Sequence, residues 1–155
     1  MTVMSGMSKP FPLEVVKELA RKQVDDCAAA LAGLRVKEGA ALQTLQMLET
    51  CRQDYQSRFE RSSQSGIGNE QWRNYHEFSG KLDQALGQQK EVVAKCALHC
   101  QTSVHEWQRA RIRLKSFDVL FERHLRGLAQ REASSEQRDQ DERSAASHQR
   151  RKQPI

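Results

Sequence analysis

Residues 62–69 read S-S-Q-S-G-I-G-N, and this short stretch decides the fold. Two glycines among small polar residues are typical of a loop, and Asn69 is a favourable cap for a helix that follows. No proline occurs between Pro12 and Pro154, so the chain between them lacks the strongest helix breaker. The sequence therefore predicts two long helices joined by one turn near Gly66.

The segment 12–62 carries an apolar stripe with the spacing of a coiled coil. From residue 24 the stripe alternates steps of three and four residues, which is the heptad pattern of a helix that packs on another helix. Its members are Val24, Cys27, Leu31, Leu34, Glu38, Ala41, Leu45, Leu48, Arg52, Tyr55 and Phe59. Nearly all of them are apolar, so the pattern predicts one continuous helix.

A second stripe with the same spacing begins after the turn. Its members are Leu86, Gln89, Val93, Cys96, Cys100, Ser103, Trp107, Ala110, Leu114, Phe117, Phe121, His124 and Leu128. Two such stripes predict an all-α fold, a long antiparallel two-helix coiled-coil hairpin. Folding about Gly66 places residue 13 opposite about residue 119, so the second helix overhangs the first at its C-terminal end. An apolar stripe that no helix covers usually marks a partner surface, although a frayed helix end is an alternative.

The predicted organisation has three parts. Residues 1–11 form a flexible N-terminus, and residues 12–143 form the coiled coil, with helix one at 12–62, the turn at 63–69 and helix two at 70–143. Beyond residue 128 the apolar residues nearly stop, but alternating charges can sustain a helix through pairs three and four residues apart. Residues 144–155 are expected to be a disordered basic tail.

The composition narrows the class of protein. Only 37% of residues are hydrophobic against 29% charged, which suits an elongated protein better than a compact domain. The net charge is +5 and is not spread evenly, but no segment is strongly basic, so a nucleic-acid footprint is weak. Four cations within residues 109–115 can meet an acidic protein or a nucleic acid, but a solvated helix face is the simpler interpretation. The chain has neither a signal peptide nor a long apolar run, which predicts a cytoplasmic protein.

No catalytic, cofactor or metal site is expected. Cys96, His99 and Cys100 crowd one helical turn, but two of them lie on the stripe, where free cysteine behaves as a small apolar residue. No second ligand pair lies opposite, and Cys27 and Cys51 are too distant along the hairpin for disulfides with them. Phosphate-binding and nucleophile motifs are absent from the sequence, and a thin hairpin offers no enclosed pocket.

The start of helix two is rich in aromatic residues. Trp72, Tyr75 and Phe78 fall just after the turn, followed by Leu82. Part of this group must cap the apolar seam between the helices. Aromatic side chains are also typical anchors of binding surfaces, so the tip of the hairpin is a candidate partner site.

These residues carry a likeness to a known family. The tip reads S-G-I-G-N-E-Q-W-R-N-Y-H-E-F at residues 65–78, with L-E-V-V-K-E-L-A-R-K-Q-V at 13–24 and E-W-Q-R-A-R-I-R-L-K at 106–115. The pattern W-x-x-Y-x-x-F after a G-I turn is the most specific element. The sequence resembles FliJ, the small coiled-coil component of the bacterial flagellar protein-export apparatus, over nearly its whole length.

The resemblance implies a non-enzymatic role in flagellar type III protein export, and hence in flagellum assembly, motility and chemotaxis. FliJ-like proteins are similar to the central stalk of rotary ATPases and insert their helix termini into the hexameric ring of the export ATPase. They are also described as contacting the cytoplasmic domain of the export gate, at the inner face of the cell membrane, and as assisting export chaperones. Two alternatives stay open: the stalk of a virulence-type secretion system, and a generic self-associating coiled-coil adaptor.

The resemblance also implies two partner-binding surfaces. The family's gate-contacting patch maps onto Phe78, Leu82, Ala85 and Gln89, to which the aromatic residues Trp72 and Tyr75 are added as candidates. Gln89 stands where the family pattern leads us to expect histidine. The surface for the ATPase ring is expected to comprise Leu13, Val16, Lys17, Ala20, Arg21, Phe117, Leu120, Phe121, Arg123 and Arg126.

Overall fold

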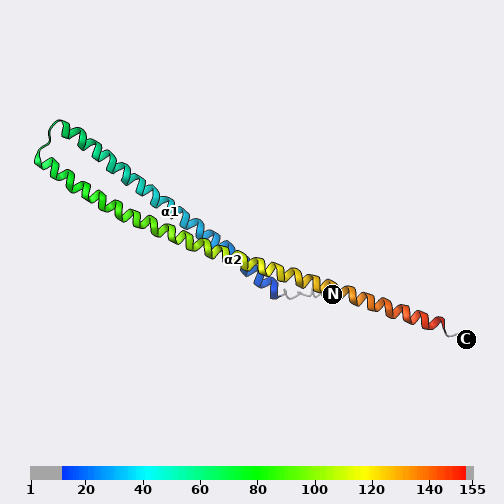
Figure 1. Ribbon diagram of the computed structural model, residues 1–155. Coiled ribbons are helices and arrows are strands. Elements are labelled where there is room, and N and C mark those ends of the chain that lie inside the picture. The colour runs from blue at the N-terminus through cyan, green and yellow to red at the C-terminus, as the bar shows by residue number, and fades with distance from the viewer. Residues whose placement is uncertain (1–11, 153–155) are drawn as a thin grey trace, which may run out of the picture. The chain divides into compact units, whose positions relative to one another are not determined.

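Two helices make up the fold. The computed structural model describes residues 12–152, in which α1 (Pro12–Gln64) and α2 (Asn69–Arg151) are the only regular elements (Figure 1). The all-α prediction is confirmed. The described residues divide into a hairpin unit, Gln23–Ala110, and a terminal unit made of residues 12–22 and 111–152. The two units are described separately below.

The turn closes as the glycines predicted. The backbone N–H groups of Ser65 and Gly66 donate to the carbonyls of Ser62 and Ser63, each at 3.2 Å, and so satisfy the last turn of α1. Gly66 has φ +82°, a left-handed conformation that a residue with a side chain rarely adopts. The loop is therefore as short as residues 65–68, slightly narrower than the predicted turn at 63–69.

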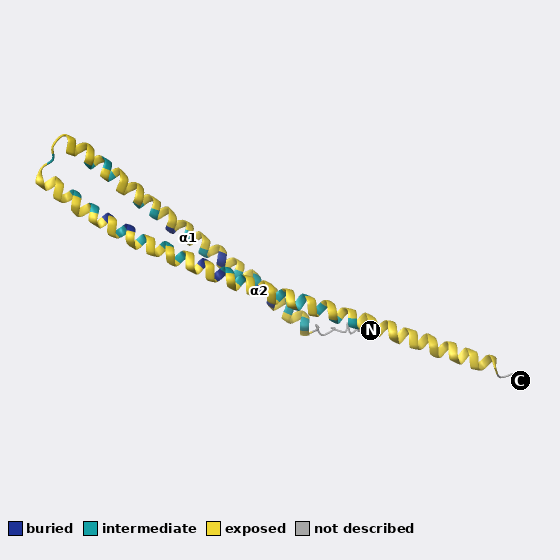
Figure 2. Cartoon of the chain, in the orientation of Figure 1, coloured by how far each residue is buried: buried dark blue, intermediate teal, exposed yellow. Residues whose placement is uncertain are grey.

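A single line of side chains forms the core of the hairpin unit. Every predicted stripe position from 24 to 59 in α1 except Arg52, and every one from 86 to 110 in α2, is at least partly buried. Figure 2 shows the buried and intermediate residues in dark blue and teal along the helices, most of whose remaining surface is exposed. The buried residues of this line are small or medium-sized: Leu31, Ala41, Leu86, Cys100, Ser103 and Ala110, together with Leu82 just before the predicted stripe.

Polar side chains join α1 and α2 of the hairpin unit where a polar residue interrupts the apolar stripe. The Gln89 side-chain amide donates to the Ala41 carbonyl at 2.9 Å, which satisfies a polar group inside the seam. The Arg52 guanidinium pairs with Asp83 at 2.9 Å, and about half of each side chain is exposed. Both pairs agree with the expected antiparallel register.

In the terminal unit, the first residues of α1 pack on α2. The Lys17 ammonium lies 2.9 Å from the Asp118 carboxylate and 4.9 Å from the centre of the Phe121 ring. Ala20 is buried beside them. From residue 128 to residue 151 every side chain of α2 is exposed, which agrees with the predicted overhang.

The predicted disordered tail differs from the structure, because residues 144–151 continue α2. This stretch contains no proline before Pro154 and has two consecutive alanines, so nothing in it stops a helix that is already formed. Its last turn carries Arg150 and Arg151, whose charges suit the negative end of the helix dipole. The predicted flexible segment 1–11 and residues 153–155 lie outside the described residues.

Candidate partner-binding surfaces

Four aromatic rings interlock beside the turn. The Tyr75 ring stacks on Phe59, with centroids 3.6 Å apart and planes 11° apart, and on Tyr55 at 5.3 Å. Tyr55 also meets the edge of Phe78, with centroids 4.6 Å apart. The rings come from both helices, so this cluster closes the seam where the chain reverses. Tyr75 therefore belongs mainly to the packing between the helices.

Trp72 and Phe78 are the aromatic side chains that the hairpin unit offers to solvent. Trp72 is 51% exposed and lies against His76, with ring centroids 4.1 Å apart. Phe78 is 43% exposed and is held from one side by Tyr55. Together, these two residues form what we call the tip surface.

The other predicted tip residues face inward to different degrees. Leu82 is only 8% exposed and packs in the seam, whereas Ala85 is half-buried. The Gln89 amide is engaged with the backbone of α1. Leu82 and Gln89 therefore belong to the seam between the helices rather than to the exposed tip surface.

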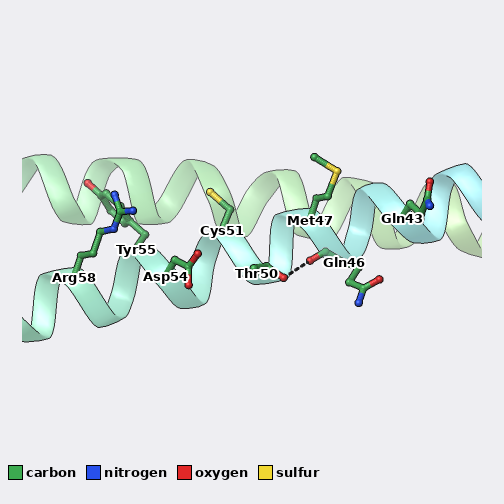
Figure 3. A pocket seen from close by; sticks show the side chains of 8 residues that line it. All are labelled: Gln43, Gln46, Met47, Thr50, Cys51, Asp54, Tyr55 and Arg58. Atoms are coloured by element: carbon green, nitrogen blue, oxygen red, sulfur yellow. Dashed lines mark hydrogen bonds between the residues drawn. The ribbon is translucent and has the colours of Figure 1, made fainter.

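A hollow on α1 adjoins the tip surface (Figure 3). Its volume is about 700 Å³, and all of its lining side chains come from one side of this helix. They are Gln43, Gln46, Met47, Thr50, Cys51, Asp54, Tyr55 and Arg58. Because Tyr55 both lines the hollow and touches Phe78, the two features meet at this ring. The sequence did not predict this hollow, because Met47 and Cys51 lie outside the apolar stripe. An apolar residue such as Met47 at an outward-facing position could have indicated it.

Exposed apolar side chains gather in the terminal unit. On α1 they are Val15, Val16 and Leu19; on α2 they are Ile112, Val119, Leu120, Leu125 and Leu128. Arg123 and Arg126 are exposed among them. We call this set the terminal surface. Sequence reasoning found Val16, Leu120 and the two arginines, but it missed most of the others because they stand outside the stripe.

Comparison with known proteins identifies the family. The family model for the flagellar FliJ protein matches residues 8–153. The chain belongs to the FliJ family. It is 27% identical to the flagellar FliJ protein of Salmonella typhi over 136 residues, which cover 88% of this chain and 92% of that relative. The flagellar FliJ protein of Escherichia coli K12 is 26% identical with the same coverage. The resemblance seen at the turn is thereby confirmed, and the chain is a member of a flagellar family.

Several residues that the FliJ resemblance assigned to the ring surface are engaged within the terminal unit. Ala20 is buried and Lys17 is held by Asp118, while Leu13, Phe117 and Phe121 are half-buried. The Arg113 guanidinium lies 5.9 Å from the Phe117 ring, and Arg21 is 3.6 Å from Glu18. These residues pack the two helices of the terminal unit together. The apolar groups that a partner of this FliJ-family chain can reach are the exposed side chains of the terminal surface.

The cysteines of this FliJ-family chain are free thiols. Burial raises the pKa of the Cys100 thiol, and a hydrogen bond to Glu38 and the charge of that carboxylate raise the pKa further. A raised pKa keeps the thiol protonated, so Cys100 is a packing residue and a poor nucleophile or metal ligand. Within residues 12–152, no group of three or more histidine, cysteine or carboxylate side chains is arranged to hold a metal ion. Neither helix has an apolar stretch in this range that could cross a membrane.

Proposed function

We propose that this FliJ-family protein is a non-enzymatic stalk of the flagellar type III protein-export apparatus. In this proposal the terminal surface binds the hexameric ring of the export ATPase, and the tip surface binds the cytoplasmic domain of the export gate. The observation that supports it is that exposed large apolar side chains gather in both units, at residues separate in sequence. A chain with two such surfaces can hold two partners at once.

The terminal surface suits a protein ring. Val16 on α1 and Leu120 on α2 are both exposed, and the Lys17–Asp118 ion pair places their helix positions at the same level along the unit. Apolar side chains at the centre of a patch with arginines at its edge are the usual composition of protein interfaces. Arg123 and Arg126 can pair with carboxylates of the ATPase, and Leu120 supplies the apolar contact.

The tip surface suits a smaller contact with the gate. Trp72 and Phe78 are large rings that lose little conformational freedom on binding, and such residues dominate the energy of many interfaces. The Tyr55 ring on α1 contacts the edge of Phe78, so one side of this ring is packed while the rest stays exposed. Bound to the gate, the protein is associated peripherally with the inner face of the cell membrane. There it assists export chaperones, and through export it supports flagellum assembly, motility and chemotaxis.

Substitution of surface residues tests the tip assignment without unfolding the hairpin. The double variant Trp72→Ala/Phe78→Ala is expected to keep its helix content and to bind the purified gate domain at least about tenfold more weakly. Leu82→Ala is the matched comparison, because its main effect is expected on stability, by about 2–4 kcal/mol. Unchanged affinity of the double variant for the gate domain would remove the tip assignment.

The ring assignment has its own test. Val16→Ser/Leu120→Ser is expected to weaken binding to the purified flagellar export ATPase at least about tenfold and to reduce stimulation of its ATP hydrolysis. Leu98→Ser is the control, since Leu98 is an exposed leucine of the hairpin unit. An equal loss of affinity for the ATPase in both proteins would indicate a nonspecific effect of surface polarity and would contradict the ring assignment. Unchanged affinity of the double variant would contradict it as well.

A further inference from the structure

The outward face of α1 in the hairpin unit carries no charge over about six helical turns. A surface helix normally places charged residues on the side opposite the core. Between residues 29 and 50, however, every position opposite the seam is uncharged, and all of these positions are exposed. We call this set the uncharged face, and its members are Ala29, Ala32, Gly33, Val36, Gly39, Ala40, Gln43, Gln46, Met47 and Thr50.

Two large apolar side chains project from the uncharged face. Val36 is 73% exposed and Met47 is 72% exposed, more than any other large apolar residue between residues 12 and 152. Met47 also lines the hollow on α1, together with Gln43 and Thr50 of the same face. Nothing within the described chain covers these two side chains, so the uncharged face is an apolar surface without an intramolecular partner.

Gly33 and Gly39 stand on this face although no contact inside the chain requires glycine there. Glycine in the middle of a helix destabilises it relative to alanine. Neither residue has a positive φ, and a Cβ added at either position would meet nothing within 4 Å. The outward face of α2 also contains glycines, but Lys81, Glu91 and Lys95 place charges on it. The combination of glycines with an uncharged surface, where another backbone can come close, therefore belongs to α1.

A regular series of four residues runs along this side of α1. Asp25, Val36, Met47 and Arg58 follow one another at intervals of eleven residues, and all four are exposed. Eleven residues make close to three helical turns, so the four side chains lie nearly in line over about 50 Å. An acidic residue begins the line, a basic residue ends it, and the two apolar residues lie between them.

We propose that a second copy of the chain docks on the uncharged face, antiparallel to the first and related to it by a two-fold axis. With the axis between residues 41 and 42, Val36 of each copy meets Met47 of the other, and Asp25 of each copy meets Arg58 of the other. A two-fold contact is self-complementary, so each of these pairs forms twice. A parallel pairing would instead bring like charges together at both ends, which the charges therefore exclude.

The chain itself is the occupant that fits this face best. A partner of a single charge sign would leave either Asp25 or Arg58 facing a like charge, whereas a second copy supplies both charges at the required spacing. In the proposed register Gly33 lies opposite Thr50 and Ala40 lies opposite Gln43. These short side chains reduce the distance between the helix axes, which the residues at the contact determine.

The size of the face predicts a weak, reversible dimer. A standard interface contains about 20–30 residues per partner, and the uncharged face with its terminal charges offers about half as many. We therefore expect a dimer Kd of about 10–100 µM. The contact uses no residue of the tip surface or the terminal surface, so the dimer does not depend on the proposed function.

Sedimentation equilibrium of the full-length chain tests the dimer. Over about 1–300 µM protein, the average mass is expected to rise from that of a monomer towards that of a dimer. Val36→Glu/Met47→Glu places carboxylates in the contact and should raise the dimer Kd at least about tenfold. Leu98→Glu is the control, because Leu98 is an exposed leucine of α2, and it should change the Kd by less than about twofold. A chain that stays monomeric throughout overturns the proposal, and so does an equal change of Kd in the two variant proteins.

Disulfide trapping tests the register. Val36→Cys and Met47→Cys are made in separate full-length chains that also carry Cys51→Ser, which removes the exposed native thiol. On mild oxidation a mixture of the two proteins should form a disulfide between positions 36 and 47 of different chains. Either protein alone should not, because the two equivalent positions lie about 16 Å apart along the helices, beyond the reach of a disulfide. A disulfide that forms as readily in either protein alone overturns the antiparallel register.

A charge exchange tests the ends of the contact. Arg58→Glu should raise the dimer Kd several-fold, because it faces Asp25 of the other copy with a like charge. Asp25→Arg/Arg58→Glu restores opposite charges and should return the Kd to within about twofold of the unaltered chain. Sedimentation equilibrium measures both values. A double variant that dimerises no better than Arg58→Glu overturns the pairing of these two residues and with it the proposed register.

Discussion

Replacing Phe59 and Tyr75 by leucine, singly and together, tests whether stacked rings hold the two helices together beside the turn. The two rings are nearly parallel, at 11°, with centroids 3.6 Å apart. An aromatic pair of this kind contributes about 0.5–1.5 kcal/mol beyond the area it buries. Both side chains are half-buried, so each single leucine variant should lose about 1–2 kcal/mol of stability.

The coupling between the two rings is the informative quantity. Urea unfolding followed by far-UV circular dichroism gives the free energy of unfolding of each variant, and the cycle of four proteins isolates the pairwise term. We expect about 1 kcal/mol of coupling for Phe59 with Tyr75. The control cycle pairs Phe59→Leu with Trp72→Leu, because Trp72 lies against His76 instead, and its coupling should be near zero. Equal coupling in both cycles would refute the role given to the stacked rings.

Three further predictions concern single positions. Gly66→Ala should lower the free energy of unfolding by about 1 kcal/mol, because a side chain is strained at its φ of +82°. Gly68→Ala, the control in the same loop, should lower it by less. Thermal unfolding of the two variants compares these losses. Lys17→Met should cost at most about 1 kcal/mol in dilute buffer and much less in high salt, since the ion pair is partly exposed; melts at two salt concentrations check this. Folding raises the pKa of the Cys100 thiol. The protonated thiol therefore contributes to the free energy of unfolding at neutral pH, and this contribution is lost as the pH rises through the titration range of the folded thiol. Accordingly, iodoacetamide at mildly alkaline pH should alkylate the exposed Cys51 well before Cys100, as peptide mass mapping would show.

Heptad spacing predicted the seam because burial along a helix follows from its geometry. Two predicted stripe positions are exposed in the structure, and each has a physical reason. Arg52 carries a charge that its long side chain takes to Asp83 at the surface, and Leu128 lies beyond the start of α1. The stripe also runs further back than predicted, since Leu82 is four residues before Leu86 and is buried on the same side.

The surfaces were harder to predict than the seam. Trp72 and Tyr75 are three residues apart and chemically similar, yet the α1 rings cover about half of Tyr75 and leave Trp72 exposed. Met47 was missed because outward positions carry no periodic signal, and its 72% exposure depends only on the absence of a neighbour. A sequence pattern specifies which residues can be inside, whereas partner surfaces depend on what is left outside.

A three-component binding measurement shows whether one chain holds the export gate and the export ATPase at the same time. The purified gate domain is immobilised, and retention of the purified export ATPase is measured with and without the full-length chain. We predict that the ATPase is retained only when the chain is present. Retention should be lost with Trp72→Ala/Phe78→Ala and, separately, with Val16→Ser/Leu120→Ser. If the chain binds each partner alone but never retains both together, the two surfaces do not act as one stalk, which contradicts the proposed function.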